Sequence, residues 1–298
     1  MKYFVAQGED RRLDAASRSG LRGAFVALSD GVTHYELAGP ANGDVVVLVG
    51  GLTIPLFYWD SVAAMLHAAG LRTLAYSGYG RGYSDRPATR YDDALFIRQV
   101  AELIQALGLR GRHHIVGSSM GALTAMGFVS AYPATAATLT ISGPAGLASK
   151  PAALRWLLVN DWLAGVFAKH FGHRWLEHHE GANLGDRTRV AELSAMIRDA
   201  YRYEGSLYAL FSTLQSFGLF DRAALYQEIA ELPVPTMLIW GRDDQVTPID
   251  KLDTARALLR PVQCHVIECG HMVPFERPEE AVSKILSFMD TNKAWGAS

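Results

Sequence analysis

The chain has 298 residues, of which 49% are hydrophobic and 19% are charged, so it can bury a sizeable core and is too apolar to be disordered. Its 28 basic and 30 acidic residues leave a net charge of −2, which argues against a protein that binds nucleic acid through bulk charge. No apolar stretch reaches the roughly 20 residues that a membrane span needs, and no signal-peptide core is visible. We therefore expect a cytoplasmic protein, without a membrane span, that acts on a small molecule; its oligomeric state is left open.

Residues 1–20 are mostly polar and indicate an arm or a frayed extension, after which β-branched runs alternate with helical patterns. Residues 45–49 are apolar throughout, as expected for a strand covered on both faces of a parallel sheet. Residues 92–107 fit a helix that Asp92 or Asp93 can cap. A further helix is predicted up to about residue 132, and further strands are predicted at residues 138–141, 236–240 and 262–267. This alternation predicts an α/β fold with a mostly parallel central sheet and flanking helices.

Residues 148–231 contain no clear strand and are predicted to form an all-helical insertion between two strands. Such an insertion lies over the carboxyl ends of the strands, where it can act as a lid that shapes a substrate pocket. Its bulky apolar groups suit the wall of such a pocket, and we expect three of them to bind substrate: Trp156, Trp162 and Phe167. The predicted organisation is an arm at residues 1–20, a core at residues 21–147 and 232–298, and a helical cap at residues 148–231.

The stretch Gly117-Ser118-Ser119-Met120-Gly121 follows a predicted strand and opens a predicted helix. A serine at a sharp strand-to-helix turn projects its hydroxyl away from the sheet, and only small flanking residues let the backbone make that turn. The start of the helix also directs N–H groups and the positive end of the helix dipole toward a developing oxyanion. In this context the pattern predicts Ser119 as a nucleophile.

Two more polar stretches follow later strands. Residues 240–248 contain Asp243 and Asp244, and residues 268–274 contain His271, which gives the chain order Ser, Asp, His. With these motifs the sequence resembles the α/β-hydrolase family, in its serine esterase and lipase-like form with a helical cap, over roughly residues 24–290. The resemblance implies that Ser119 is the nucleophile, His271 the general base and Asp244 the acid that orients it, while Asp243 is a turn residue or helix cap.

The stretch Gly50-Gly51-Leu52-Thr53 stands where family members usually have His-Gly. The resemblance implies that the N–H groups of Leu52 and Met120 form the oxyanion hole, with Gly51 beside the substrate. Residues 77–87 are also family-like, although Ser77 replaces the usual aspartate. No cofactor is expected, because every group that the mechanism needs is in the chain.

Two other clusters point to chemistry only weakly. Four histidines crowd the insertion, but their spacing does not match a zinc site, so no metal is expected: His170, His173, His178 and His179. The two cysteines, Cys264 and Cys269, would be separated by roughly 16 Å in an extended strand, too far for a disulfide, so we expect both to be reduced.

The serine nucleophile favours a carboxylic ester hydrolase, an esterase or a lactonase acting on a bulky ester or macrolactone. Haloalkane dehalogenases and epoxide hydrolases resemble this fold but use an aspartate in that position. A carbon–carbon bond hydrolase of ring-cleavage products is the alternative, with cations for a diketo acid from Arg81, Arg155 or Arg174. A small-ligand receptor and a cofactor-free oxygenase or perhydrolase on the same fold are also compatible with the sequence.

Overall fold

The computed structural model describes residues 1–181, 184–185 and 187–292. The molecule is built on an eight-stranded central sheet with the strand order β1-β2-β4-β3-β5-β6-β7-β8. The strands from β4 to β8 are parallel, whereas β2 is antiparallel to both β1 and β4. Their bounds are β1 (Ala24–Leu28), β2 (Gly31–Ala38), β3 (Val45–Val49), β4 (Arg72–Tyr76), β5 (His113–Ser118), β6 (Ala136–Ser142), β7 (Thr236–Gly241) and β8 (Gln263–Ile267). The predicted α/β fold with a mostly parallel sheet is therefore confirmed.

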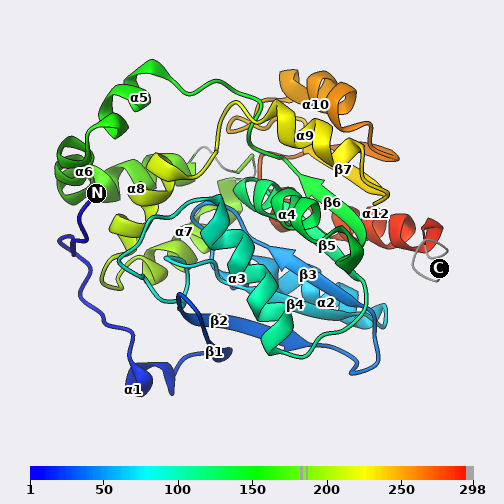
Figure 1. The fold of residues 1–298 in the computed structure, drawn as a ribbon, viewed down its shortest axis with the longest axis horizontal. Helices are drawn as coiled ribbons and strands as arrows, with labels where there is room; N and C mark the ends of the chain where they lie inside the picture. The colour runs from blue at the N-terminus through cyan, green and yellow to red at the C-terminus, as the bar shows by residue number, and fades with distance from the viewer. Residues whose placement is uncertain (182–183, 186, 293–298) are drawn as a thin grey trace.

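Helices cover both faces of the sheet. One layer contains α3 and α4, with α9 packed against α4 and α10 beside α9, and the other contains α2, α11 and α12 (Figure 1). Asp92 caps α3 by accepting the Leu95 N–H at 3.1 Å, in agreement with the sequence pattern. The bounds are α2 (Asp60–Ala68), α3 (Asp93–Ala106), α4 (Met120–Ala131), α9 (Ala223–Ala230), α10 (Leu252–Leu259), α11 (Val273–Glu276) and α12 (Pro278–Thr291), with short 3-10 turns at Leu56–Trp59, Pro133–Thr135 and Ile249–Lys251. Because β3 and β5 are enclosed on both faces, their residues are almost all buried, which explains the continuous apolar run of β3.

The expected cap lies between β6 and β7 in sequence, and its elements are helical throughout the part that the structure describes. Four of its helices pack on one another to one side of the sheet (Figure 1). They are α5 (Ala152–Val159), α6 (Asp161–Gly181), α7 (Val190–Ala200) and α8 (Ser206–Ser216), with a 3-10 turn at Arg187–Arg189 before α7. None of the described helices is both long and apolar enough to cross a membrane.

The N-terminal arm is ordered and lies along this cap rather than fraying (Figure 1). The amino group of Met1 pairs with Asp161 at 2.9 Å, and the ring of Phe4 meets that of Tyr208 edge-on. The buried carboxylate of Glu9 accepts the N–H groups of Gly205 at 2.9 Å and Leu207 at 2.7 Å. The arm, which continues to the short helix α1 (Ala15–Arg18), therefore ties the cap to the sheet edge.

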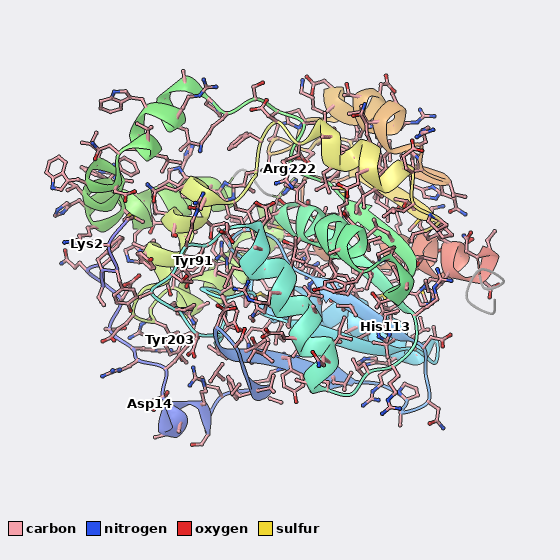
Figure 2. All side chains as sticks on the ribbon, in the orientation of Figure 1. Lys2, Asp14, Tyr91, His113, Tyr203 and Arg222 are labelled. Atoms are coloured by element: carbon pink, nitrogen blue, oxygen red, sulfur yellow. The ribbon has the colours of Figure 1, made fainter. Side chains whose placement is uncertain are left out.

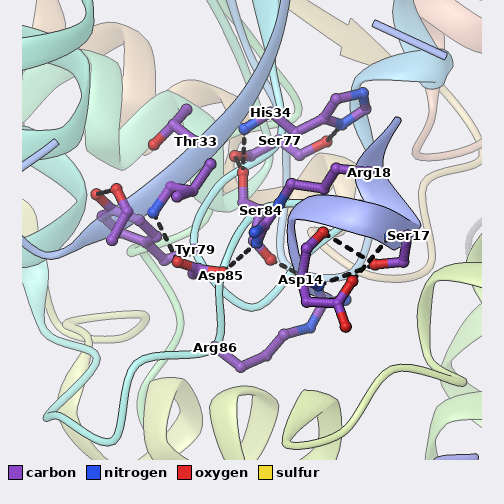
Figure 3. A network of polar contacts seen from close by, with 12 residues as sticks. Asp14, Ser17, Arg18, Thr33, His34, Ser77, Tyr79, Ser84, Asp85 and Arg86 are labelled. Carbon is purple, nitrogen blue, oxygen red and sulfur yellow. Dashed lines mark hydrogen bonds and ion pairs between the residues drawn. The ribbon is translucent and has the colours of Figure 1, made fainter. Parts of the chain in front are cut away.

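A buried polar network joins β2 to the loop after β4 (Figure 3). His34 has no solvent exposure; its Nδ1 contacts Ser77 Oγ at 3.1 Å, and its Nε2 contacts the Arg22 carbonyl at 2.8 Å. Burial lowers the pKa of His34 to about 4, so the ring is neutral at pH 7. Ser77 stands where the family usually has an aspartate. It accepts the Leu56 N–H at 3.1 Å and so connects the loop after β4 to the segment after β3.

Candidate active site

Ser119 stands between β5 and α4 with φ 58° and ψ −121°, a strained conformation for a residue with a side chain. The turn is possible because the residues two positions before and two positions after Ser119 are glycines. A Cβ on Gly121 would lie 2.3 Å from the Val49 carbonyl oxygen, and one on Gly117 would lie 2.5 Å from the Gly121 carbonyl oxygen. The Ser119 N–H donates to the Ser142 carbonyl at 2.9 Å, which fixes the turn against β6. The residue predicted as nucleophile is thus held rigidly at the start of a helix.

Asp244 and His271 form a buried pair at the ends of β7 and β8. His271 Nδ1 lies 2.7 Å from Asp244 Oδ2, and both side chains are at most 1% exposed. The other carboxylate oxygen, Oδ1, accepts the N–H groups of Val246 at 2.8 Å and Thr247 at 2.7 Å. Thr247 Oγ1 also donates to Oδ2 at 2.8 Å. Because the aspartate is held from both sides, it fixes the ring of His271 through Nδ1.

The exposed neighbour Asp243 takes no part in this pair. Its N–H donates to the Cys269 carbonyl at 3.0 Å, as expected of a turn residue.

The loop after β3 lies beside the serine. A Cβ on Gly51 would be 3.3 Å from Ser119 Cβ, and Leu52 and Met120 line the same cavity as Ser119. Neither the Leu52 nor the Met120 N–H donates to another group within the part of the chain that the structure describes. Two backbone donors at the start of α4 and in this loop are what an oxyanion needs.

Arg81 holds that loop by hydrogen bonds. Its buried guanidinium donates from Nε to the Leu52 carbonyl at 2.7 Å, from Nη1 to the Tyr79 carbonyl at 2.8 Å, and from Nη2 to Thr213 Oγ1 of α8 at 2.9 Å. The side chain therefore connects this loop, called the oxyanion loop for its predicted role, to the cap. It does not line the cavity, so it is a positioning group rather than a substrate ligand.

A cavity of about 210 Å³ opens above Ser119, between the sheet and the cap. Its wall is mostly apolar: the cap contributes Leu154, Trp175 and Leu214, and the segments after β6 and α8 contribute Pro144, Ala145, Leu147, Leu219 and Phe220. Val246, Thr247 and Pro248 close the side next to Asp244. Lys251 is the one Lys or Arg among the lining residues of the described ranges, and its Nζ is 3.3 Å from the Asp250 carboxylate. The cavity suits the apolar part of a small molecule.

The cap also contributes His179 to this wall, a residue that the sequence analysis treated only as part of a candidate metal cluster. His179 stacks on Trp175 with ring centroids 5.1 Å apart and an interplanar angle of 9°. Burial, with the positive charge that His271 can carry, lowers the pKa of His179 to about 4. Its neutral ring can accept or donate one hydrogen bond in the cavity. The sequence signal was the i, i+4 spacing, which puts both rings on one helix face.

The aromatic residues expected to bind substrate lie elsewhere. Trp156 and Trp162 are 67% and 71% exposed, and Phe167 packs against Phe211 inside the cap. None of the three lines the cavity. Trp156 and Trp162 stand on other faces of their helices than Leu154 and Trp175, whereas Phe167 shares the side of Trp175 but lies two turns earlier in α6. The structure thus places Ser119, Leu52 and Met120 at one cavity and pairs Asp244 with His271 behind Thr247 of its wall, but leaves these three aside.

The histidine cluster disperses. His173 Nε2 contacts the Gln7 carbonyl at 3.0 Å, while His170 and His178 are exposed. Within residues 1–181, 184–185 and 187–292 no three His, Cys, Asp or Glu side chains gather as a metal site. Both cysteines are free, and burial raises the pKa of Cys269 to about 12.

The architecture is that of an α/β-hydrolase. The sequence profile of the alpha/beta hydrolase family matches residues 46–285, and the chain therefore belongs to that family. A relative in sequence is the 2-hydroxy-6-oxo-6-(2'-aminophenyl)hexa-2,4-dienoic acid hydrolase of Metapseudomonas resinovorans, 26% identical over 286 residues, which are 93% of this chain and 94% of that protein.

Two solved structures share the fold. A thermophilic esterase from Thermogutta terrifontis has a TM-score of 0.77 at 19% identity, covering 91% of this chain and 99% of its own. An enol-lactonase from Burkholderia xenovorans has a TM-score of 0.75 at 21% identity, covering 90% of this chain and all (100%) of its own. The names of the three proteins describe a dienoic acid hydrolase, an esterase and an enol-lactonase.

Proposed function

We propose that the protein is a serine hydrolase that cleaves a carboxylic ester or lactone through an acyl-enzyme on Ser119. The observation that carries the proposal is the position of Ser119. It lies at the floor of an apolar cavity whose side wall, Val246 and Thr247, holds the carboxylate of the Asp244–His271 pair. Acyl transfer requires a nucleophile, an oriented base and N–H donors for the oxyanion, and the arrangement of these residues supports that chemistry.

In the proposed reaction, His271 Nε2 takes the Ser119 hydroxyl proton while Oγ attacks the substrate carbonyl carbon. The carbonyl oxygen becomes an oxyanion that accepts the N–H groups of Leu52 and Met120. The imidazolium then gives its proton to the leaving alkoxide, the carbon–oxygen bond breaks, and an acyl ester remains on Ser119. A water molecule, deprotonated by His271, attacks this ester, and the carboxylic acid and free serine are formed.

The charges around the cavity favour an ester over a diketo acid. A diketo acid carries a carboxylate that needs a cation, and the sequence offered three arginines. Arg81 is bonded to protein acceptors, and Arg155 and Arg174 are exposed residues outside the cavity wall. What is left among the described lining residues is Lys251, which Asp250 partly neutralises.

Carbon–carbon bond hydrolysis of a ring-cleavage product is the second candidate function. The similarity over 93% of the chain to the dienoic acid hydrolase of M. resinovorans supports it. In this case the Lys251 ammonium would pair with the substrate carboxylate. The two candidates therefore differ in what Lys251 does.

The test is a panel of p-nitrophenyl esters and lactones run beside a ring-cleavage dienoate, with wild type and Ser119→Ala. We expect turnover of an ester or lactone with a burst of released alcohol stoichiometric with enzyme, and no burst from the variant. A specificity constant for the dienoate more than tenfold above that of the best ester, lost in Lys251→Met, would establish the second candidate instead. Tight binding of a ligand with turnover slower than its dissociation would indicate a receptor.

A further inference from the structure

The cap has an outer apolar face that the proposed reaction does not use. It consists of exposed side chains on α5 and α6, here called the outer face: Trp156, Val159, Trp162 and Val166. Trp162 and Val166 are four positions apart and so share one side of α6. The opposite side of that helix already has its partners, because Ala164 and Ala168 are fully buried.

Packing within the part of the chain that the structure describes leaves these side chains exposed. Trp59 and Trp240, by contrast, have no exposed surface at all. Two tryptophans more than 60% exposed on neighbouring helices are an unusual loss of apolar burial for a soluble surface. Rings of this kind favour a boundary between water and an apolar phase.

The charge around the outer face is positive although the whole chain is at −2. Residues 150–169, which span the outer face, contain Arg155, Lys169 and Lys150, the last donating to the Leu214 carbonyl at 3.3 Å, and only one acidic residue, Asp161. That carboxylate is already paired with the Met1 amino group at 2.9 Å. Lys2 extends from the arm beside α6 (Figure 2). Apolar rings surrounded by cations are complementary to an anionic lipid surface.

We infer that the outer face of the cap docks the protein reversibly on an anionic lipid membrane, with Trp156 and Trp162 inserted at the level of the headgroups. The same two helices reach the cavity from their other side, through Leu154 of α5 and Trp175 and His179 of α6. Docking therefore brings the cavity close to the lipid. The consequence that the substrates are apolar acyl esters taken from that phase rests on the proposed function, whereas docking itself does not.

The experiment measures flotation with vesicles of phosphatidylcholine, alone or with phosphatidylserine at about 30%, in the absence of any ester. Wild type is compared with Trp156→Gln/Trp162→Gln, with Arg155→Gln/Lys169→Gln, and with Val262→Gln as the matched control, since Val262 is 62% exposed away from the cap. Thermal melting confirms that each variant is folded.

We expect wild type and the Val262 variant to float with the anionic vesicles, and salt to weaken the binding. The tryptophan pair should lower the partition coefficient by at least about tenfold on both vesicles, since apolar area is lost. The Arg155/Lys169 pair should lower it on anionic vesicles alone. Brominated lipid should quench wild-type emission more than that of the tryptophan variant, because the two proteins differ only in the exposed residues Trp156 and Trp162.

Failure of wild type to bind anionic vesicles, or equal binding by the tryptophan variant, would overturn the inference. So would light scattering that shows a dimer dissolved by the tryptophan substitutions without vesicle binding, because the outer face would then serve a second copy of the chain. Since no ester is present, these results are independent of whether the proposed hydrolysis is correct.

Discussion

Replacing Asp244 by Asn changes one atom and should remove nearly all activity without unfolding the protein. The contacts decide how the new amide is oriented. Oδ1 accepts the N–H groups of Val246 and Thr247, so the amide oxygen must take this place, because an NH2 group there would face two donors. The amide nitrogen then takes the place of Oδ2, 2.7 Å from His271 Nδ1.

An NH2 group only donates, so His271 Nδ1 must become the acceptor and its proton moves to Nε2. A protonated Nε2 cannot take the proton of Ser119. The loss of an oriented carboxylate of this kind costs about 10⁴ in kcat, equivalent to about 5.5 kcal/mol of transition-state stabilisation.

The assay is kcat on a p-nitrophenyl ester, with melting temperature measured in parallel and Asp243→Asn as the control. The Asp243 side chain is exposed and makes no contact with His271, so its variant should stay within about twofold of wild type. If Asp244→Asn retains more than a tenth of the wild-type kcat while folded, or if Asp243→Asn is the more damaging change, the assigned geometry of the base is refuted.

Four further outcomes are expected. Ser119→Ala should lose roughly 10⁴ to 10⁶ in kcat, and a variant that keeps a tenth of the rate would exclude Ser119 as nucleophile. Trp175→Ala should raise KM for long acyl esters more than it lowers kcat, with an acetyl ester little affected. The control Trp156→Ala should leave the chain-length preference unchanged; the reverse pattern would place the acyl-binding site at Trp156 instead. Exhaustive chelation should leave ester turnover unchanged, since each reacting group is a side chain or backbone N–H; loss that is restored by one metal would refute this. The pKa of buried His34 is lowered to about 4, so between pH 6.5 and 4 the unfolded chain binds more protons than the folded chain, and the free energy of unfolding falls as pH falls. His34→Gln should remove about 2 kcal/mol of the difference in unfolding free energy between pH 7 and pH 5, measured by urea titration. An unchanged difference would contradict this assignment.

The core of the fold was predictable because its strands are enclosed on both faces and therefore read as short apolar runs, as at residues 45–49. The β1–β2 hairpin was not, since its strands are half exposed and carry Thr, His and Glu among the apolar residues. The elbow at Ser119 was visible as a pattern because its glycines are required by close backbone approaches.

The cavity wall could not be derived from sequence. Helix α6 carries aromatic residues on more than one side, so composition does not indicate which side faces Ser119. Trp162 and Trp175 look alike in the sequence, yet one is exposed and the other stacks on His179 in the cavity. Only the packing of α6 on α8 separates them.

The guanidinium of Arg81 has a consequence for engineering. It is satisfied by one acceptor in the oxyanion loop and another, Thr213 Oγ1, in the cap. Caps exchanged between family members to change specificity would leave this buried cation short of an acceptor unless a hydroxyl arrives at the position of Thr213, at a cost of about 1–3 kcal/mol. Arg81 would then hold the Leu52 carbonyl less firmly, so a chimera that binds its new substrate well would still lose kcat. Modular as the cap looks in sequence, an incoming cap has to carry a hydroxyl at the position of Thr213 to match Arg81.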